Sequence, residues 1–350
     1  MKIGVLTGGG DCPGLNGVIR AIVNRGISTY DDTILGYWDG WRGPLEGRSE
    51  TLTLARVRDI LPLGGTILGT SRTNIADPER LATVIAQLQA DNVDALIPIG
   101  GEDTLGVALR LAEAGVQVIG VPKTIDNDLS GTDVTFGFTT AVQVAVEAVD
   151  RVRTTSASHH RGLVVEVMGR HAGWIALQTG LACSAVATLI PEVPFDLDAI
   201  CGLVAASIQE RRDAIVVVAE GALPRAGTIE NDQGGAVDEF GHVQVGGIAE
   251  FIAKEITRRS GVETRSVVLG HVQRGGTPTA YDRVLATRFG VAAVDGLHQG
   301  KTGVMVSAQG SAIGIVPLAE ATGTLRTVPR QLIDEVGAIL GIDSADMKYK

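Results

Sequence analysis

Two carboxylates and a lysine stand close together in the segment Lys123–Asp128, which reads Lys-Thr-Ile-Asp-Asn-Asp. An apolar run from Val116 to Val121 precedes this segment and is typical of a buried β-strand. In an open α/β sheet, ligands bind at the carboxyl ends of the strands, where this segment would lie. Carboxylates there can take a proton or hold a metal ion, and a lysine can neutralise phosphate. A plain turn is the simpler alternative, since aspartate and asparagine favour turns.

Glycine-rich turns follow two other expected strands. The first turn spans Gly8–Pro13, and a helix should begin near Pro13, with Asp11 available to cap it. The second turn spans Gly100–Thr104, and a helix should begin at Leu105. Such turns can bind phosphate, because backbone N–H groups and the helix dipole both face them. Neither has the spacing of a Walker loop or of a dinucleotide fingerprint.

Strands and helices alternate along most of the chain, which predicts an α/β fold with mainly parallel sheets and right-handed crossovers. The length of 350 residues favours two domains over one. Beyond the segments above, we expect strands at Leu163–Val167, Asp213–Ala219 and Val267–Leu269, and helices at Phe138–Arg153, after the turn Met168–Gly173 and from Tyr281.

The domain boundary should lie near Gly137, where a glycine-flanked segment separates two series of strands and helices. Residues 223–247 are polar and rich in glycine, which is typical of a loop or hairpin insertion. The expected first domain comprises residues 1–137 plus about 272–323, and the second comprises 138–271 plus about 324–350.

The composition argues against several classes of function. A net charge of −10 disfavours a surface for nucleic acid or anionic membranes, and no apolar run approaches the length of a membrane span. Cys12, Cys183 and Cys201 are too few and too scattered for a disulfide framework or a zinc site. Since no signal sequence is visible, we expect a cytoplasmic protein that binds neither nucleic acid nor membranes.

The residues that could do chemistry share one position in the expected fold, because each group follows a predicted strand. A shared sheet edge favours a single site over independent turns. Glycine turns, carboxylates, a lysine and arginines are what phosphoryl transfer requires. These groups are Gly9–Asp11, Glu102 and Asp103, Asp126 and Asp128, Arg170, Glu220, and His271 with Arg274.

Five motifs, in the same order and at similar spacing, resemble the phosphofructokinase family over about residues 1–300. The resemblance implies two similar three-layer α/β domains, with the active site in the cleft between them. It implies that the first domain binds the phosphoryl donor and Mg²⁺, and that the second binds fructose 6-phosphate. The motifs are Gly8–Asn16, Gly100–Thr104, Pro122–Asp128, Met168–Arg170 and Gly270–Gly276.

The resemblance also implies a role for each matching residue on the donor side. Asp126 would be the catalytic base that takes the proton from the 1-hydroxyl of fructose 6-phosphate. Gly9 and Gly10 would offer backbone donors beside the transferred phosphoryl group, and Arg72 would bridge donor and acceptor. Glu102 would hold Mg²⁺.

On the sugar side, Thr124 and Asp128 would flank the base. In the family, the equivalents of Arg161 and Arg265 reach in from a neighbouring subunit, so a homodimer or homotetramer is implied. The residues that would contact the sugar are Met168, Gly169, Arg170 and Glu220, and those of the 6-phosphate pocket are Arg161, Arg265, His271 and Arg274.

Asp103 points to pyrophosphate as the donor. Family members that use ATP have glycine at this position, which leaves room for the α-phosphate, whereas an aspartate adds bulk and negative charge there. Pyrophosphate has no α-phosphate, and Lys123 could neutralise its dense charge and assist catalysis. Relatives that use pyrophosphate resemble this chain at both positions, so we predict a reversible, pyrophosphate-dependent 6-phosphofructokinase of glycolysis.

Several alternatives remain open. Some ATP-dependent relatives also look similar at Lys123, so the prediction of the donor depends on Asp103, and an ATP-dependent enzyme is the second interpretation. A catalytically inactive regulatory subunit and a kinase for another substrate are the others. Taken singly, Arg170 could pair on the surface, His271 could lie in a core, and the arginines at 161 and 265 could be solvated charges.

Overall fold

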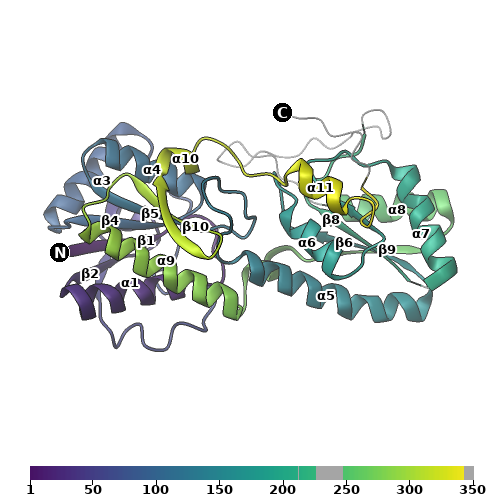
Figure 1. The fold of residues 1–350 in the computed structure, drawn as a ribbon, viewed down its shortest axis with the longest axis horizontal. Helices are drawn as coiled ribbons and strands as arrows, with labels where there is room; N and C mark the ends of the chain where they lie inside the picture. Colours follow the sequence, from purple (N-terminus) through teal and green to yellow (C-terminus); the bar gives the residue numbers. More distant parts are fainter. Residues whose placement is uncertain (212, 226–246, 343–350) are drawn as a thin grey trace. The chain divides into compact units, whose positions relative to one another are not determined.

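The structure is a computed structural model that describes residues 1–211, 213–225 and 247–342. The chain divides into two compact units, and each is described by itself (Figure 1). The first unit comprises Met1–Thr140 and Arg274–Leu325, and the second comprises Ala141–Gln273 and the chain from Arg326 onward. The functions that we predict for the two parts stay predictions.

The first unit contains a seven-stranded sheet in the order β11-β10-β5-β4-β1-β2-β3. Its five inner strands are parallel, whereas β3 and β11 run antiparallel to their neighbours at the two edges. The strands are β1 (Lys2–Thr7), β2 (Thr33–Tyr37), β3 (Ser49–Leu52), β4 (Ala95–Gly100), β5 (Gln117–Pro122), β10 (Val304–Gln309) and β11 (Ala312–Pro317).

Helices cover both faces of this sheet, so the first unit has three layers. In Figure 1, α1 and α9 lie on one face and α3, α4 and α10 on the other. All six residues of β4 are buried, as expected of a central parallel strand between two helical layers. The helices are α1 (Leu15–Tyr30), α2 (Arg42–Glu46), α3 (Pro78–Ala90), α4 (Glu102–Glu113), α9 (Ala280–His298) and α10 (Leu318–Ala321).

The second unit contains a four-stranded parallel sheet in the order β7-β8-β6-β9. Helix α8 packs against β6 and β9, α7 packs against β8, and α6 packs against β7 and β8. The strands are β6 (Gly162–Val167), β7 (Ala187–Leu189), β8 (Ala214–Ala219) and β9 (Thr264–Val268). The helices are α5 (Phe138–His159), α6 (Trp174–Ala182), α7 (Leu197–Arg211), α8 (Ile248–Ser260), η1 (Gly270–Arg274, a 3₁₀ helix) and α11 (Arg330–Val336).

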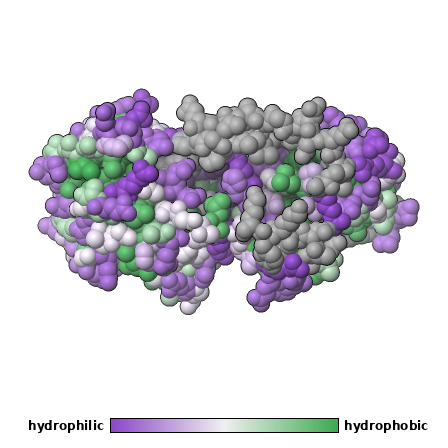
Figure 2. Space-filling view, turned by 90° about the horizontal axis from the view of Figure 1, so that it is seen from above, coloured by the Kyte–Doolittle hydropathy of each residue, from purple (hydrophilic) through white to green (hydrophobic). Residues whose placement is uncertain are grey.

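The predicted α/β fold with mainly parallel sheets is confirmed. Hydrophilic side chains cover much of the described surface in Figure 2, with smaller hydrophobic areas between them. Among the residues that the structure describes, no helix is long and apolar enough to cross a membrane.

Three predicted helix boundaries are wrong. Helix α1 begins at Leu15, two residues after Pro13, and its cap is Gly14 in a left-handed conformation without a capping side chain, so Asp11 does not cap it. Helix α4 begins at Glu102 instead of Leu105, because acidic residues in a first turn interact favourably with the helix dipole. Helix α5 continues past Arg153 to His159.

The extension of α5 covers a stretch that hydrophobic periodicity does not mark. Residues 154–158 read Thr-Thr-Ser-Ala-Ser and have no apolar stripe. Hydroxyl groups in this stretch bond to helix carbonyls, since Thr154 Oγ1 donates to Arg151 O at 2.9 Å and Ser158 Oγ to Thr154 O at 2.8 Å. Most of the insertion expected at 223–247 lies outside the described residues.

Candidate active site

The predicted donor-side residues lie at the carboxyl edge of the sheet in the first unit. The turns after β1, β4 and β5 are neighbours there, because these strands are adjacent in the sheet. Backbone hydrogen bonds fasten them together, from Gly8 N to Ile99 O at 2.9 Å and from Lys123 N to Gly100 O at 2.9 Å. The edge therefore brings together segments that are far apart in the sequence.

Lys123 joins the turn after β5 to the turn after β1. Its side chain is only 4% exposed, and its Nζ donates a hydrogen bond to Gly10 O. A Cβ added to Gly9 would lie 3.6 Å from the same Nζ. Burial lowers the pKa of the Lys123 amine, because removing an ammonium group from water disfavours its charged form. A bound anion beside this nitrogen would offset that cost.

The segment after Lys123 forms a turn that hydroxyl and amide groups hold in place. Asp126 N donates to Thr124 Oγ1 at 3.1 Å, and Thr124 Oγ1 donates to Asp128 Oδ1 at 3.1 Å. The backbone of this segment is therefore a turn, as the simpler alternative held. Thr124 links Asp126 and Asp128, the two aspartates that we predict to act on the sugar.

Two buried residues that sequence reasoning did not single out support this turn. Asn127 is left-handed, with φ 54°, and its Oδ1 accepts from Thr135 N at 3.0 Å. Thr135 Oγ1 in turn donates to Thr124 O at 2.7 Å. An asparagine between two aspartates suggests a residue in the left-handed conformation. Nothing in the sequence indicates that Thr135, eight positions later, is its hydrogen-bond partner.

Arg72 lies on an exposed segment that is bonded to the first glycine turn. Gly9 N donates to Ser71 O at 3.2 Å, and Thr70 Oγ1 donates to Gly9 O at 2.6 Å. Arg72 therefore stands beside the glycine turn, as its predicted bridging role requires. The Gly9 N–H, which we expected to face a phosphoryl group, donates to the Ser71 carbonyl in this structure.

Glu102 and Asp103 occupy the first turn of α4, and both are exposed. The capping residue is Gly101, whose backbone is extended. Both acids stabilise the helix N-terminus through its dipole, which is the structural alternative to a role in binding. Their position at the carboxyl end of β4 nevertheless places them on the same edge as Lys123 and Gly9.

A magnesium ion fits this edge only if the substrate supplies ligands. Across residues 1–211, 213–225 and 247–342, no three His, Cys, Asp or Glu side chains are grouped so as to hold a metal ion. Mg²⁺ is commonly bound by one or two carboxylates together with substrate phosphates and water. An exposed Glu102 in a glycine turn suits that kind of site.

Arg274, the last residue of η1, contacts the first glycine turn, and Cys12 is part of that turn. Arg274 Nη1 donates to Asp11 O at 3.3 Å, and a Cβ added to Gly10 would lie 2.6 Å from Nη1, so the guanidinium lies close against the turn. We predicted Arg274 for the 6-phosphate pocket, and the structure places its guanidinium against the donor-side turn. Burial raises the pKa of Cys12 to about 12, so its thiol stays protonated and is no nucleophile.

The predicted sugar contacts lie at the carboxyl edge of the sheet in the second unit. Met168, Gly169 and Arg170 follow β6, Glu220 follows β8, and His271 follows β9 in η1. Backbone bonds join these segments, such as the one from residue 221 N to Gly169 O at 3.2 Å. Gly169 has φ 130°, and a Cβ there would lie 2.7 Å from a carbonyl oxygen, so the turn requires glycine.

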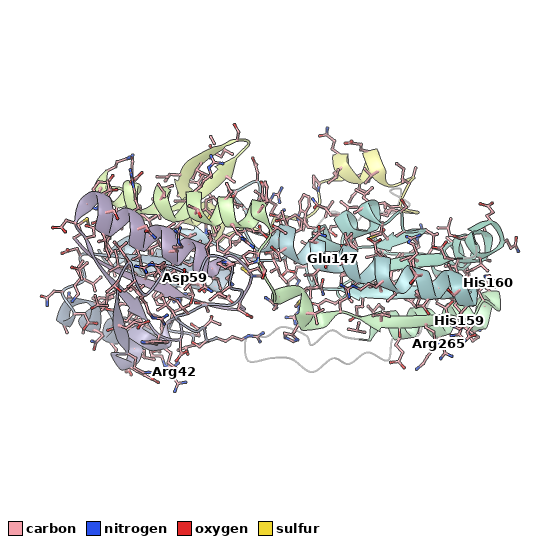
Figure 3. The ribbon with its side chains drawn as sticks, turned by 90° about the horizontal axis from the view of Figure 1, so that it is seen from below. Arg42, Asp59, Glu147, His159, His160 and Arg265 are labelled. Carbon is pink, nitrogen blue, oxygen red and sulfur yellow. The ribbon has the colours of Figure 1, made fainter. Side chains whose placement is uncertain are left out.

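Arg161 and Arg265 lie at the opposite, amino edge of the same sheet. Arg161 directly precedes β6, and Arg265 is the second residue of β9. Glu263 contacts both, with Oε2 at 3.0 Å from Arg161 Nε and Oε1 at 2.7 Å from Arg265 Nη2. Figure 3 shows Arg265 with His159 and His160 at this end of the second unit. The structure therefore does not bring these arginines to the other sugar-site residues of the same unit.

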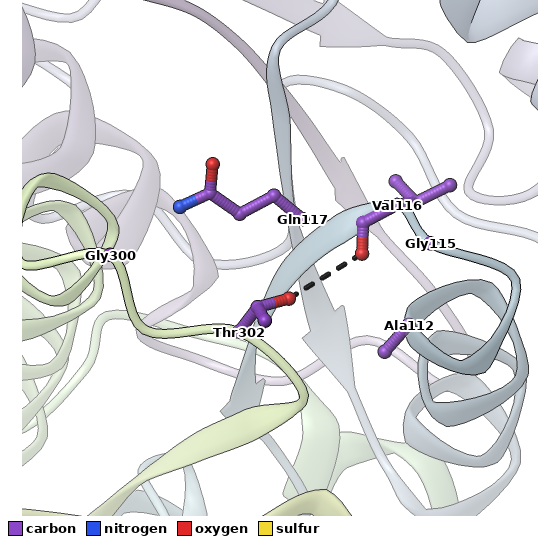
Figure 4. A pocket seen from close by; sticks show the side chains of 6 residues that line it. All are labelled: Ala112, Gly115, Val116, Gln117, Gly300 and Thr302. Carbon is purple, nitrogen blue, oxygen red and sulfur yellow. Dashed lines mark hydrogen bonds between the residues drawn. The ribbon is translucent and has the colours of Figure 1, made fainter.

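A cavity of about 330 Å³ in the first unit is not part of this site. Gln117, the first residue of β5, lines it, whereas the predicted catalytic segment follows the last residue of that strand (Figure 4). Thr302 Oγ1 donates to Val116 O at 3.5 Å across it. None of the predicted site residues is among its lining residues, which are Ala112, Gly115, Val116, Gln117, Gly300 and Thr302.

Comparison with known proteins identifies relatives along nearly the whole chain. Residues 2–297 match the family model described as Phosphofructokinase. A Streptomyces coelicolor protein named pyrophosphate--fructose 6-phosphate 1-phosphotransferase is 57% identical over 344 residues, covering 97% of this chain and 100% of that protein. An ATP-dependent 6-phosphofructokinase 3 of the same organism is 52% identical over 345 residues, with the same coverage.

Solved structures agree on the fold. A pyrophosphate-dependent phosphofructokinase from Nitrosospira multiformis has a TM-score of 0.82 at 22% identity, covering 100% of this chain and 94% of that chain. A phosphofructokinase from Pichia pastoris has a TM-score of 0.81 at 30% identity over 97% of this chain, which spans 36% of the yeast chain.

Proposed function

This chain belongs to the phosphofructokinase family, and from that premise we propose that it phosphorylates fructose 6-phosphate with pyrophosphate. The product is fructose 1,6-bisphosphate, and the reaction is reversible because both phosphoryl donors are of similar strength. The observation that carries the choice of donor is Asp103, an exposed carboxylate in the first turn of α4. The three free cysteines suit a reducing, cytoplasmic setting for this glycolytic step.

Asp126 is the catalytic base in this proposal. It takes the proton from the 1-hydroxyl, so that the oxygen attacks the transferring phosphoryl group in line. Thr124 orients the base, since its hydroxyl accepts from Asp126 N and donates to Asp128. Asp128 would accept a hydrogen bond from the sugar in this proposal.

The negative charge of the donor is met by Lys123 and Arg72. Lys123 follows β5, and its Nζ bonds to Gly10 O in the first glycine turn. Arg72 follows Ser71, which bonds to Gly9 in that turn. Glu102 would hold Mg²⁺ together with oxygens of the donor, and the ion would neutralise phosphate charge during transfer. Charges positioned in this way stabilise the charge that develops on the transferring phosphoryl group.

Asp103 disfavours ATP through charge and bulk. Two unit charges 4 Å apart repel by about 4 kcal/mol at an effective dielectric constant near 20, roughly a thousandfold in affinity. Because Asp103 is exposed, solvent screening reduces this penalty. Three relatives at 56–57% identity carry the pyrophosphate-dependent name, whereas those named as ATP-dependent are 52–53% identical.

Initial rates with the two donors test this function. The purified chain, given fructose 6-phosphate and Mg²⁺, should turn over with pyrophosphate and not with ATP. Fructose 1,6-bisphosphate and inorganic phosphate should yield pyrophosphate in the reverse assay, and chelating Mg²⁺ should stop both directions. Turnover with ATP alone would contradict the donor assignment, and no turnover with either would favour a regulatory subunit.

The position of Arg161 and Arg265 supports an active homo-oligomer. Strand β6 has six residues, so the two edges of the sheet are about 20 Å apart. The arginine pair of one chain is therefore remote from the Met168–Arg170 turn of its own unit. We propose that it completes the 6-phosphate pocket of a neighbouring subunit.

Mixing two inactive variants tests this sharing. An Asp126→Asn chain and a chain carrying Arg161→Ala with Arg265→Ala should each be inactive alone. In a mixed dimer, one site regains both the base and the arginine pair, so random reassociation should restore about a quarter of the wild-type sites. Activity of the mixture equal to the sum of the two separate variants would contradict sharing between subunits.

A further inference from the structure

The segment that carries Arg72 is fastened by the hydroxyl group of Ser71. Ser71 Oγ lies 2.6 Å from Asp39 O and 2.9 Å from Thr73 Oγ1, and it accepts from Thr73 N at 3.3 Å. A hydroxyl group has one proton, and the shorter contact to a carbonyl oxygen takes it. The contact with Thr73 Oγ1 and the hydrogen bond from Thr73 N hold Thr73 to the same hydroxyl group, so the residues on both sides of Arg72 meet at Ser71 Oγ.

Asp39, whose carbonyl oxygen accepts from the Ser71 hydroxyl, is itself held in place by its neighbours. Asp39 adopts a left-handed conformation with φ 57°, and its N–H donates to Leu68 O at 2.8 Å. Its carboxylate lies 3.0 Å from Arg48 Nη1. A Cβ added to Gly69 would lie 2.4 Å from Asp39 Oδ1, so the 69 position also needs glycine. The Asp39 carbonyl is therefore a fixed acceptor after β2.

The backbone of Ser71 makes a further hydrogen bond, to the first glycine turn. Its carbonyl oxygen accepts from Gly9 N at 3.2 Å, in the turn after β1. Ser71 thus connects the turns that follow two neighbouring strands, through its hydroxyl to one and its carbonyl to the other. Arg72 is attached directly to this junction.

We propose that Ser71 is a positioning residue that fixes the guanidinium of Arg72 relative to the first glycine turn. This inference rests on the proposed function in one respect, which is that Arg72 acts on the phosphoryl group in transfer. A charge aimed at the transition state loses effect when it is displaced by about 1 Å. Without its hydroxyl, residue 71 keeps its bond to Gly9 but loses the tie to Asp39, which loosens the segment that carries Arg72.

Ser71→Ala should lower kcat by about tenfold and change KM for fructose 6-phosphate little, since the lost interaction acts in the transition state. Ser71→Thr keeps a hydroxyl group and should retain most of the activity. Ser207→Ala is a matched control in the second unit, because Ser207 Oγ donates to Asp213 O at a similar 2.7 Å. That control should leave kcat unchanged.

A double-mutant cycle separates positioning from mere loop stability. If Ser71 acts through Arg72, Ser71→Ala should have no further effect on kcat in an Arg72→Ala background. An equal loss of kcat in both backgrounds, or no loss in either, would overturn the proposal. The cycle is run with whichever donor the wild type uses, so turnover with ATP would contradict the donor assignment and leave the cycle readable.

Discussion

Asp126→Asn should lower kcat by about a thousandfold, because an amide cannot accept the proton of the sugar hydroxyl, and a positioned base contributes about 10²–10⁴ in rate. The variant keeps the size of the side chain and the backbone N–H that bonds to Thr124. KM for fructose 6-phosphate should therefore change by less than about threefold. A coupled assay with single-turnover rates measures both quantities.

Asp133→Asn is the matched control for this substitution. Asp133 lies in the same loop region, and its Oδ2 accepts from Gly310 N at 2.7 Å, which fastens the loop to the β10–β11 hairpin. Its loss should lower the melting temperature by a few degrees and leave kcat within about twofold of wild type. If Asp126→Asn keeps more than about a tenth of wild-type kcat, Asp126 is not the base.

The sequence predicts this edge of the first sheet well, and the reason is local. Apolar runs such as Ala95–Gly100 are buried on both sides and end in glycine turns, so strand, turn and helix follow from neighbouring residues. Topology then brings Gly9, Asp103 and Asp126 to one edge, because parallel strands share their direction.

The parts that were not predicted depend on residues far apart in the chain. Arg274 packs against a turn some 260 positions earlier, and Ser71 bonds to Asp39 across two loops. Neither contact leaves a periodic signal. The edge strands β3 and β11 are short or half-exposed and pair antiparallel, so they lack the continuous apolar run of β4. The inner strands β2 and β10 were not predicted either.

The arginines at the amino edge of the second sheet show a different limit of prediction from the sequence. Arg161 and Arg265 resemble their family equivalents by position alone. In this unit they bind Glu263, an ordinary exposed salt bridge of small energetic value. Only the distance to the other edge of the sheet supports a role in a second subunit.

Asp103→Gly should raise kcat/KM for ATP by about a hundredfold. The full charge repulsion corresponds to roughly a thousandfold, and exposure of Asp103 to solvent reduces it. The rate with pyrophosphate should fall by less than about tenfold, since this donor has no α-phosphate to meet the carboxylate. Initial rates with each donor at several concentrations give the ratio directly.

Asp103→Asn separates charge from bulk, because the amide keeps the size of the side chain and removes its charge. If repulsion dominates, asparagine should recover most of the ATP activity that glycine does. If space for the α-phosphate dominates, only glycine should recover it. Either result supports Asp103 as the selecting residue, whereas unchanged donor preference in both variants would assign selection elsewhere.

Helix stability needs its own control, since glycine in a first turn removes a favourable acid and adds backbone freedom. The two effects together cost about 1–2 kcal/mol. Glu79→Gly imposes the same change at the matching position of α3, the first-turn acid after Pro78. It should lower the melting temperature about as much as Asp103→Gly and leave the donor ratio unaltered. A shift of donor preference confined to position 103 would therefore report the binding of the donor, because the loss of helix stability is common to both variants.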